Sequence, residues 1–293
     1  MLLSNTDMST STNRRPRVTH RLQSESVVKF DRKQRRIRVD GKSAKGITKL
    51  LKSTFYPSYN YNKSLESSTK TTTATTATTT NGIAGVKKIK GSARVGRGFD
   101  TSVSQSVRLQ QLYQLPFDVF FNKQRAEVVA KEKAMTPSHR KQLYTLVNPD
   151  KRIPYVQRFW QTMRKLQLRP VDTQVGVSHP TMKLATLIDV VCMDNKGSYR
   201  VIELKSGFET YYSKSNGKMN APFEDQDNSP MNQHQLQLTA TDAMFRHTFP
   251  TRSIGEPLIM RFDSNGVDVY PQRVPYRQRC ESMFQSLATK HKL

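Results

Sequence analysis

Two apolar segments joined by a polar turn constrain the fold of this chain more than any other feature. Residues 185–193 and 199–205 are both rich in β-branched side chains, and the turn between them contains Gly197. This pattern predicts a β-hairpin, because β-branched residues favour strands and glycine favours tight turns. If residues 195–197 form a three-residue loop with Gly197 in the left-handed conformation, the register of the two strands is fixed.

In that register Asp189 faces Glu203 across the two strands. Directly opposed residues point to the same face of a sheet, with their β-carbons about 4.5–5.5 Å apart. Lys205 lies two residues beyond Glu203, so it emerges on the same face. Two carboxylates at this distance repel each other unless a cation lies between them, and a hard divalent ion such as Mg²⁺ prefers oxygen ligands. The hairpin therefore predicts a cation site on this face.

This arrangement resembles the core of the PD-(D/E)xK nuclease superfamily. Asp189 matches the family's aspartate, and Glu203-Leu204-Lys205 matches its E-x-K motif. The resemblance implies an α/β (α+β) fold with a restriction-endonuclease-like core, in which helices flank a central mixed β-sheet. It also implies that Asp189, Glu203 and the backbone carbonyl of Leu204 hold Mg²⁺ or Mn²⁺, and that Lys205 orients the attacking water. The simpler alternative is a surface ion pair between Glu203 and Lys205.

A later segment matches the family's fourth motif in part. Residues 232–245 have the apolar spacing of a helix that packs on a sheet, with His234, Gln237 and Thr241 on a second, polar face. The family carries Q-x-x-x-Y here, so Gln237 fits the glutamine and Thr241 replaces the tyrosine. The resemblance implies that Gln237 positions the catalytic site. Gln233 competes for this role, and an ordinary helix-surface amide is the simpler alternative for Gln237.

Two segments of the N-terminal half are similar to RecB-type and lambda-exonuclease-like nucleases, including the mitochondrial genome maintenance exonuclease group and viral relatives. Residues 46–51 resemble the segment that leads into the nuclease domain of that group, and residues 91–100 resemble its glycine-containing first-helix motif. Where this chain has Asp100, the family usually carries a histidine that helps bind a second metal. Asp100 is therefore a candidate metal ligand, and the alternative is that it caps a helix over residues 101–115.

The segment between the hairpin and the later helix is polar and predicts a mobile loop, residues 206–230, over the mouth of the site. Tyr211 and Tyr212 lie in it, and aromatic rings can stack on the bases of single strands. The candidate nucleic-acid contacts are Gln233, His234, Tyr211 and Tyr212. Upstream, residues 170–177 predict a further strand. Many RecB-type nucleases have an acidic residue at the end of the corresponding segment, so the resemblance makes Asp172 and Gln174 candidate site residues, and ordinary polar residues at a strand edge are the simpler alternative.

The balance of charge indicates a polyanionic partner. The chain has 48 Lys and Arg against 23 Asp and Glu, which gives a formal net charge of +25 and a sequence pI near 10.2. Such a charge predicts salt-sensitive attraction to phosphates. DNA is the expected partner and RNA is not excluded, whereas no small-molecule cofactor is implied. No apolar run approaches the ~20 residues of a membrane span, so no membrane partner is expected.

Composition also divides the chain. Residues 1–24 predict a disordered basic arm, and residues 25–61 predict a hairpin and the first helix of the nuclease domain. Residues 62–81 form a Thr-rich low-complexity insertion, and residues 82–293 then form the nuclease core. Only two cysteines are present, so neither a disulfide framework nor a zinc site is expected, which indicates an intracellular protein. The nucleus, a mitochondrion and a viral replication site are all compatible with these features.

Together these features predict a metal-dependent deoxyribonuclease, and we expect an exonuclease of DNA replication, repair or recombination. The metal ion would lower the pKa of a bound water and neutralise charge on the scissile phosphate. Two alternatives remain open, a catalytically degenerate nucleic-acid-binding protein and a basic structural protein of a virion or ribonucleoprotein. The missing first-motif histidine favours the degenerate protein, whereas the complete set of Asp189, Glu203 and Lys205 argues against it.

Overall fold

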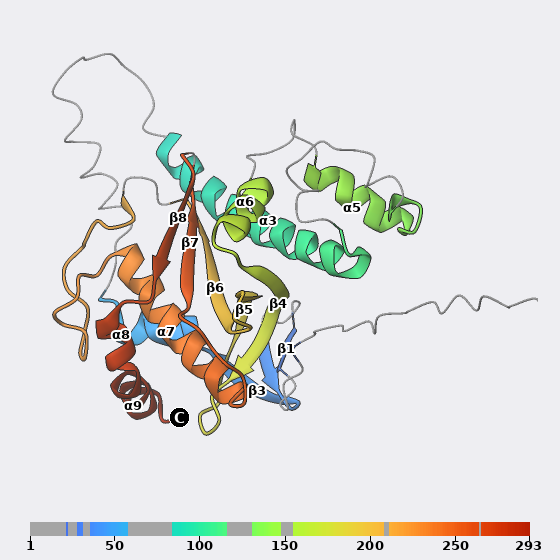
Figure 1. Ribbon diagram of the computed structural model, residues 1–293. Helices are drawn as coiled ribbons and strands as arrows, with labels where there is room; N and C mark the ends of the chain where they lie inside the picture. The colour runs from blue at the N-terminus through green and yellow to red at the C-terminus, as the bar shows by residue number, and fades with distance from the viewer. Residues whose placement is uncertain are drawn as a thin grey trace, which may run out of the picture.

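The computed structural model describes most of the chain. The described residues are 22, 28–31, 36–57, 84–115, 131–147, 155–207, 211–263 and 265–293, without the side chains of 84–97. Within these ranges eight strands form one mixed sheet, and helices cover both of its faces (Figure 1). The predicted α/β architecture, with a central mixed sheet flanked by helices, is therefore confirmed. The Thr-rich insertion and, apart from residue 22, the predicted basic arm lie outside the described residues.

The sheet combines an antiparallel meander with two parallel junctions. Its strands are β1 (Val28–Asp31), β2 (Arg36–Val39), β3 (Lys42–Gly46), β4 (Arg169–Ser178), β5 (Leu184–Met193), β6 (Tyr199–Ser206), β7 (Leu258–Phe262) and β8 (Val267–Pro271). The path runs β1-β2-β3-β5-β6-β7-β8, and β4 pairs with β5. The β3–β5 and β6–β7 pairs are parallel, and the other pairs are antiparallel.

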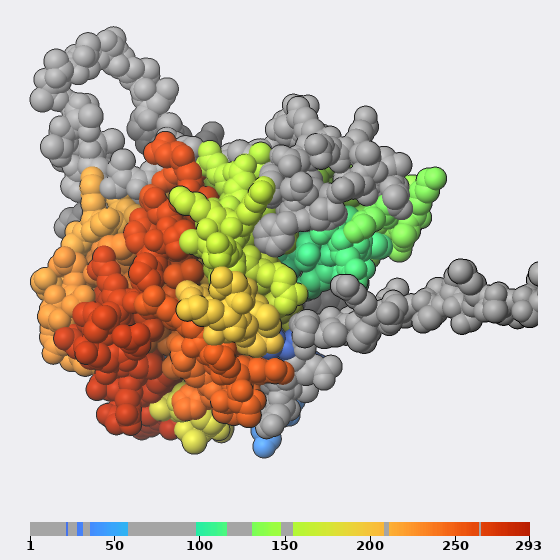
Figure 2. Space-filling model, viewed as in Figure 1, coloured from blue at the N-terminus to red at the C-terminus, as the bar shows by residue number. Residues whose placement is uncertain are grey.

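The helices belong to two layers, one on each face of the sheet. In chain order they are α1 (Ile47–Phe55), α3 (Ala84–Tyr113), α5 (Pro137–Val147), α6 (Tyr155–Lys165), α7 (Pro230–Thr248), α8 (Val274–Gln278) and α9 (Cys280–His291). Helices α1, α7 and α9 share one apolar core with the sheet, and α3 and α6 share another. The space-filling view shows the C-terminal elements in red and orange to the left of the green helices (Figure 2). No helix in the described ranges is long and apolar enough to cross a bilayer.

The two cores divide the side chains of the central strands according to the strand period of two. Val191 and Val201 face the core of α1, α7 and α9, whereas Val190 and Ile202 face the core of α3 and α6. All four side chains are completely buried. A strand covered on both faces needs an almost continuous apolar sequence, and this explains the two apolar arms seen in the sequence.

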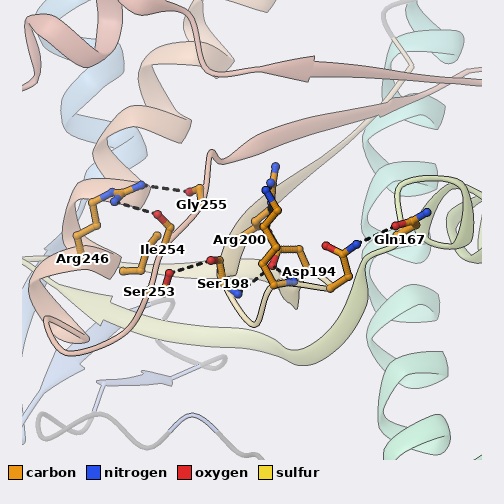
Figure 3. A network of polar contacts seen from close by, with 10 residues as sticks. Gln167, Asp194, Ser198, Arg200, Arg246, Ser253, Ile254 and Gly255 are labelled. Carbon is orange, nitrogen blue, oxygen red and sulfur yellow. Dashed lines mark hydrogen bonds and ion pairs between the residues drawn. The ribbon is translucent and has the colours of Figure 1, made fainter.

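The predicted hairpin is present in the predicted register. Met193 pairs with Tyr199, and Gly197 has a φ of 81°. The Asp194 carboxylate closes the turn, because its Oδ1 accepts hydrogen bonds from two backbone N–H groups of the turn, at 3.0 and 2.9 Å. Its Oδ2 lies 3.3 Å from the guanidinium of Arg200 (Figure 3). The turn is thus held by its own side chains.

One expectation about the loops is wrong. The sequence predicts a mobile loop over residues 206–230, but two apolar side chains of this largely exposed segment are anchored in the core. Met219 and Phe223 are buried, and the Phe223 ring stacks on Tyr276 with centroids 5.4 Å apart. Two buried apolar anchors within a polar stretch do not form a periodic pattern, so the sequence pattern did not reveal them.

Candidate active site

The candidate residues gather where two neighbouring strands separate. The ladder between β5 and β6 ends at the pair Val190–Ile202, and from Ile202 onward β6 pairs with β7. Directly beyond this fork the Asp189 carboxylate takes the place of a strand neighbour. Its Oδ2 accepts a hydrogen bond of 2.9 Å from the backbone N–H of Leu204. In an extended strand the N–H and C=O of one residue point to the same edge, so the Leu204 carbonyl is directed towards the β5 side as well.

Glu203, Lys205 and Gln237 form one hydrogen-bonded group next to this fork. The Lys205 Nζ lies 2.5 Å from the Glu203 Oε1, and the Gln237 Nε2 donates to the same oxygen at 2.5 Å. A contact of 3.5 Å joins the Lys205 Nζ to the Gln237 Oε1. The first two side chains come from β6 and the third comes from α7, so the group closes only when the helix packs on the sheet. Glu203 is only 2% exposed.

The charges of this group influence one another strongly. Burial and the nearby Glu203 carboxylate raise the pKa of Asp189 well above its usual value. Burial disfavours the charged form of Lys205, but Glu203 and Asp189 outweigh this effect and raise the pKa of Lys205 above its ordinary value. The buried Glu203 carboxylate and the half-buried Asp189 carboxylate around a single lysine leave the cluster with more negative than positive charge when all three are ionised. A divalent cation would relieve this excess.

Asp100 comes close to the same group from α3. Burial raises the pKa of its carboxyl group to about 6, with opposing contributions from Lys205 and Glu203. The alternative role of Asp100 as an N-cap is wrong, because the residue lies inside α3 (Ala84–Tyr113) and not at its start. The helix begins earlier than the sequence motif suggested, and it brings Asp100 close enough to Lys205 and Glu203 to feel their charges.

One carboxylate oxygen without a hydrogen-bond partner bears on whether a metal ion fits this group. Among the described residues, the Glu203 Oε2 is buried and has no hydrogen-bond partner. A buried carboxylate oxygen without a partner costs free energy, and a coordinated cation would remove that cost. No group of three His, Cys, Asp or Glu side chains in these ranges has a geometry ready for a metal. Asp189, Glu203 and the Leu204 carbonyl therefore remain the predicted donor set, in which only two ligands are side chains.

His234 and Tyr212 border the group, and Tyr212 differs from the sequence expectation. The His234 Nδ1 lies 3.1 Å from the Tyr212 hydroxyl, and burial with the charge of Lys205 lowers the pKa of His234 well below its usual value. Tyr212 is 2% exposed, and the guanidinium of Arg261 lies 5.0 Å from its ring centroid. The predicted stacking of Tyr212 on a base is therefore wrong. Arg261 was missed because nothing in the β7 sequence distinguishes it from other strand arginines.

The remaining candidate contacts lie at the edge of the site. Gln233 donates from Nε2 to the Asn228 Oδ1 at 2.9 Å, so the structure brings Gln237, and not Gln233, to the carboxylates. Tyr211 is partly exposed and directly precedes the buried Tyr212.

The two candidates on β4 lie opposite the fork. The pairs Thr173–Val190 and Val175–Ile188 place Gln174 across from Asp189. Gln174 has a φ of 55°, a left-handed conformation that is uncommon for a residue other than glycine and interrupts the ladder at this point. Asp172 instead accepts a hydrogen bond of 2.8 Å from the backbone N–H of the next residue.

Comparisons with known proteins identify no relative in sequence. No protein-family model matches the chain, and no curated protein matches it. Among solved structures, the chain is similar to the one described as the crystal structure of SSO0001, over 63% of this chain and 74% of that chain. The two are 12% identical, and their TM-score of 0.23 is too low to show a common fold.

Proposed function

We propose that this protein is a metal-dependent nuclease that hydrolyses phosphodiester bonds of DNA. One observation carries the proposal: the buried Glu203 Oε2 has no hydrogen-bond partner among the described residues and belongs to a group with a second, half-buried carboxylate, Asp189. A chain with a net charge of +25 attracts the phosphate backbone towards such a group. We further propose that it acts as an exonuclease in DNA replication, repair or recombination.

In this proposal each residue of the group has a separate role. Asp189, Glu203 and the Leu204 carbonyl would hold Mg²⁺ or Mn²⁺, which supplies a bound water of lowered pKa and neutralises charge on the phosphate. Lys205 stays protonated at neutral pH because its pKa is raised, so it donates a hydrogen bond to the attacking water and does not act as a general base. Gln237 fixes the orientation of the Glu203 carboxylate through Oε1, which leaves Oε2 for the cation.

A second candidate function is nucleic-acid binding without hydrolysis. The observation in its favour is the short ion pair between Lys205 and Glu203, which neutralises one carboxylate without any metal. Thr241 also favours this candidate, because it replaces the tyrosine of the family that the chain resembles. Within the described ranges its buried hydroxyl has no hydrogen-bond partner. This candidate differs from the first in a single property, the turnover of DNA.

The test is degradation of end-labelled single- and double-stranded DNA, linear and circular, with Mg²⁺, Mn²⁺ or EDTA. We expect cleavage that requires the metal, and we expect Lys205→Ala and Glu203→Gln each to lower the rate about 100-fold or more. Glu256→Gln is the matched control, because Glu256 is exposed and lies outside the group. Circular dichroism of each variant separates loss of chemistry from loss of fold.

The outcomes distinguish the candidates. Cleavage of linear DNA that spares circles identifies an exonuclease, and an RNA substrate in parallel shows whether the sugar matters. If wild-type protein binds DNA at low salt but cuts none of these substrates with either metal, the nuclease proposal is wrong and the binding protein is supported.

A further inference from the structure

The N-terminal meander carries a cationic face that the proposed catalytic group does not use. In the β1–β2–β3 register Lys29 pairs with Arg38, and Arg38 pairs with Ser43. Since strand residues two apart share a face, Arg36 and Lys45 emerge on the same side as these three. All five side chains are exposed, whereas Val28, Ile37 and Val39 on the opposite side are partly buried.

This face contains a charge arrangement that disfavours folding. Lys29 and Arg38 are directly opposed, and like charges directly opposite each other destabilise a strand pair. The same ladder also contains a pair of opposite charges, because Asp31 pairs with Arg36. The hairpin thus includes one favourable and one unfavourable cross-strand charge pair, and an anion bound over Lys29 and Arg38 would remove the repulsion.

Helix α1 repeats this arrangement next to β3. Lys49 and Lys52 are both exposed and three residues apart, so they are neighbours of like charge on the helix surface. The end of α9 joins the region, because Lys290 Nζ donates to the Ser53 carbonyl at 2.9 Å and Lys45 Nζ donates to the His291 carbonyl at 3.2 Å. We call this region the N-terminal basic surface. It comprises Lys29, Arg36, Arg38, Lys45, Lys49, Lys52 and Lys290.

The surface is separate from the catalytic group. Strand β3 joins β5 through the pair Gly46–Ala185, and Asp189 lies four residues further along β5. At about 3.3 Å per residue this is roughly 13 Å along the strand, and Lys29 lies two strands further out. The segment of a polyanion that binds the N-terminal basic surface would therefore differ from the segment that contacts Asp189.

The chemistry of the surface favours nucleic acid over a lipid bilayer. Membrane-binding surfaces combine cations with large apolar side chains that enter the bilayer. Among the described residues, Phe30 is the one exposed large apolar side chain of the meander, and strand alternation places it on the face opposite Lys29 and Arg38. Cations without apolar neighbours match a phosphate backbone, which is bound through charge alone.

We infer that the N-terminal basic surface is a second nucleic-acid-binding site, which holds the sugar–phosphate backbone away from the catalytic carboxylates. The inference rests on the proposed function only for the choice of nucleic acid, and it requires no hydrolysis. Such a site binds without regard to base sequence. It would keep the protein on a strand while the active site works on another part of the same molecule.

The test uses substitutions for which stability and binding are expected to move in opposite directions. Lys29→Glu creates an opposite-charge pair with Arg38, and Lys49→Glu creates one with Lys52 on α1, so each should raise the melting temperature slightly. Lys196→Glu is the matched control, with the same change in charge at an exposed position of the β5–β6 turn. Affinity for a labelled DNA oligonucleotide is measured in EDTA over a range of salt concentrations, so that cleavage plays no part.

We expect Lys29→Glu and Lys49→Glu each to weaken binding roughly fivefold without loss of stability. The slope of log K against log salt is negative, and in the double variant its magnitude should fall by about 1.4 for single-stranded DNA, at about 0.7 for each lost phosphate contact. The inference is wrong if binding is unchanged, if Lys196→Glu has the same effect, or if the variants lose affinity for anionic vesicles and not for DNA. Failure of the nuclease assay would leave this result untouched.

Discussion

Asp189 is the residue at which stability and the proposed chemistry conflict. Its carboxylate is disfavoured in the charged form, as its raised pKa shows. Without divalent metal we therefore expect Asp189→Asn to raise the free energy of unfolding at pH 7 by about 1 kcal/mol in urea denaturation. Added Mg²⁺ should stabilise the wild type and not the variant. Asp227→Asn, at a half-exposed surface ion pair, is the control that should show neither effect.

The raised pKa values of Asp189 and Asp100 predict that the stability of the protein depends on pH. Asp189 and Asp100 have pKa values above the ordinary 3.8, and that of Asp100 is about 6. The folded state therefore holds more protons than the unfolded state above pH 4, so the stability that these groups contribute is present below about pH 4 and is lost as the pH rises through 6. Urea titrations in EDTA should show a shallower fall between pH 4 and 7 for Asp100→Asn than for wild type. Equal slopes would contradict the raised pKa of Asp100.

Gly176 is fixed by a close approach of β1 to β4. A Cβ at this position would lie 2.5 Å from the Val28 Cβ and 3.1 Å from the Val28 carbonyl oxygen. We expect Gly176→Ala to cost about 1–3 kcal/mol, because the backbone of β1 must move. Gly46→Ala is the control, since its Cβ would meet only Ile37 at 3.8 Å. Similar unfolding midpoints for both variants would show that β1 adapts freely.

At the scale of elements, Arg246 joins the end of α7 to the chain that leads into β7. Its NH2 group donates to the Gly255 carbonyl at 3.2 Å (Figure 3). Its Nε lies 2.8 Å from the Asp242 Oδ2. Asp242 is buried, and within the described ranges its Oδ1 has no hydrogen-bond partner. The arginine is therefore the main compensation for that charge.

Removal of Arg246 should cost more than removal of the pair. We expect Arg246→Met to lower the free energy of unfolding by about 2 kcal/mol, because it leaves the Asp242 charge buried and uncompensated. The double variant with Asp242→Asn should recover a large part of that loss. A double-mutant cycle in urea measures the coupling, and a coupling near zero would mean that Arg246 acts only through the loop carbonyls.

The sequence predicted strands and helices correctly where their apolar residues recur with a regular period. The hairpin, the strand over residues 170–177 and the helix over residues 232–245 were all found, because each carries an apolar pattern with the period of its structure. The packed segment after β6 was not, because its anchors Met219 and Phe223 follow no period. The start of α3 was also missed, since its glycines are unfavourable in a helix interior.

At the scale of the whole molecule, the two apolar cores share one sheet and should unfold together. The chain's single tryptophan, Trp160, is completely buried in the α3 and α6 core, where its Nε1 donates to the Ser106 hydroxyl at 3.0 Å. Tryptophan fluorescence therefore reports on one face of the sheet, whereas far-UV circular dichroism reports on all of it. We expect the two urea transitions of the wild type to coincide.

A substitution on the opposite face tests this cooperativity. Leu51→Ala removes a completely buried side chain of α1 and should cost about 3 kcal/mol. The Trp160 transition should shift as far as the circular dichroism transition, although α1 does not touch the core of Trp160. Leu112→Ala, at a 63% exposed position, is the control with little effect. A shift confined to circular dichroism would mean that the two faces unfold separately.

The sequence alone determined the hairpin, its register and the shared face of Glu203 and Lys205, whereas the Asp189 carboxylate, predicted on that face, instead bonds the backbone N–H of Leu204. Those properties depend on the strand period of two and on a tight glycine turn, and both are local. Only the tertiary structure decided that β6 leaves β5 just before Leu204, that α7 brings Gln237 and not Gln233 to the carboxylates, and that α3 adds Asp100. These contacts join residues far apart in the chain, and their positions depend on how helices pack on the two faces of the sheet, which no local pattern encodes.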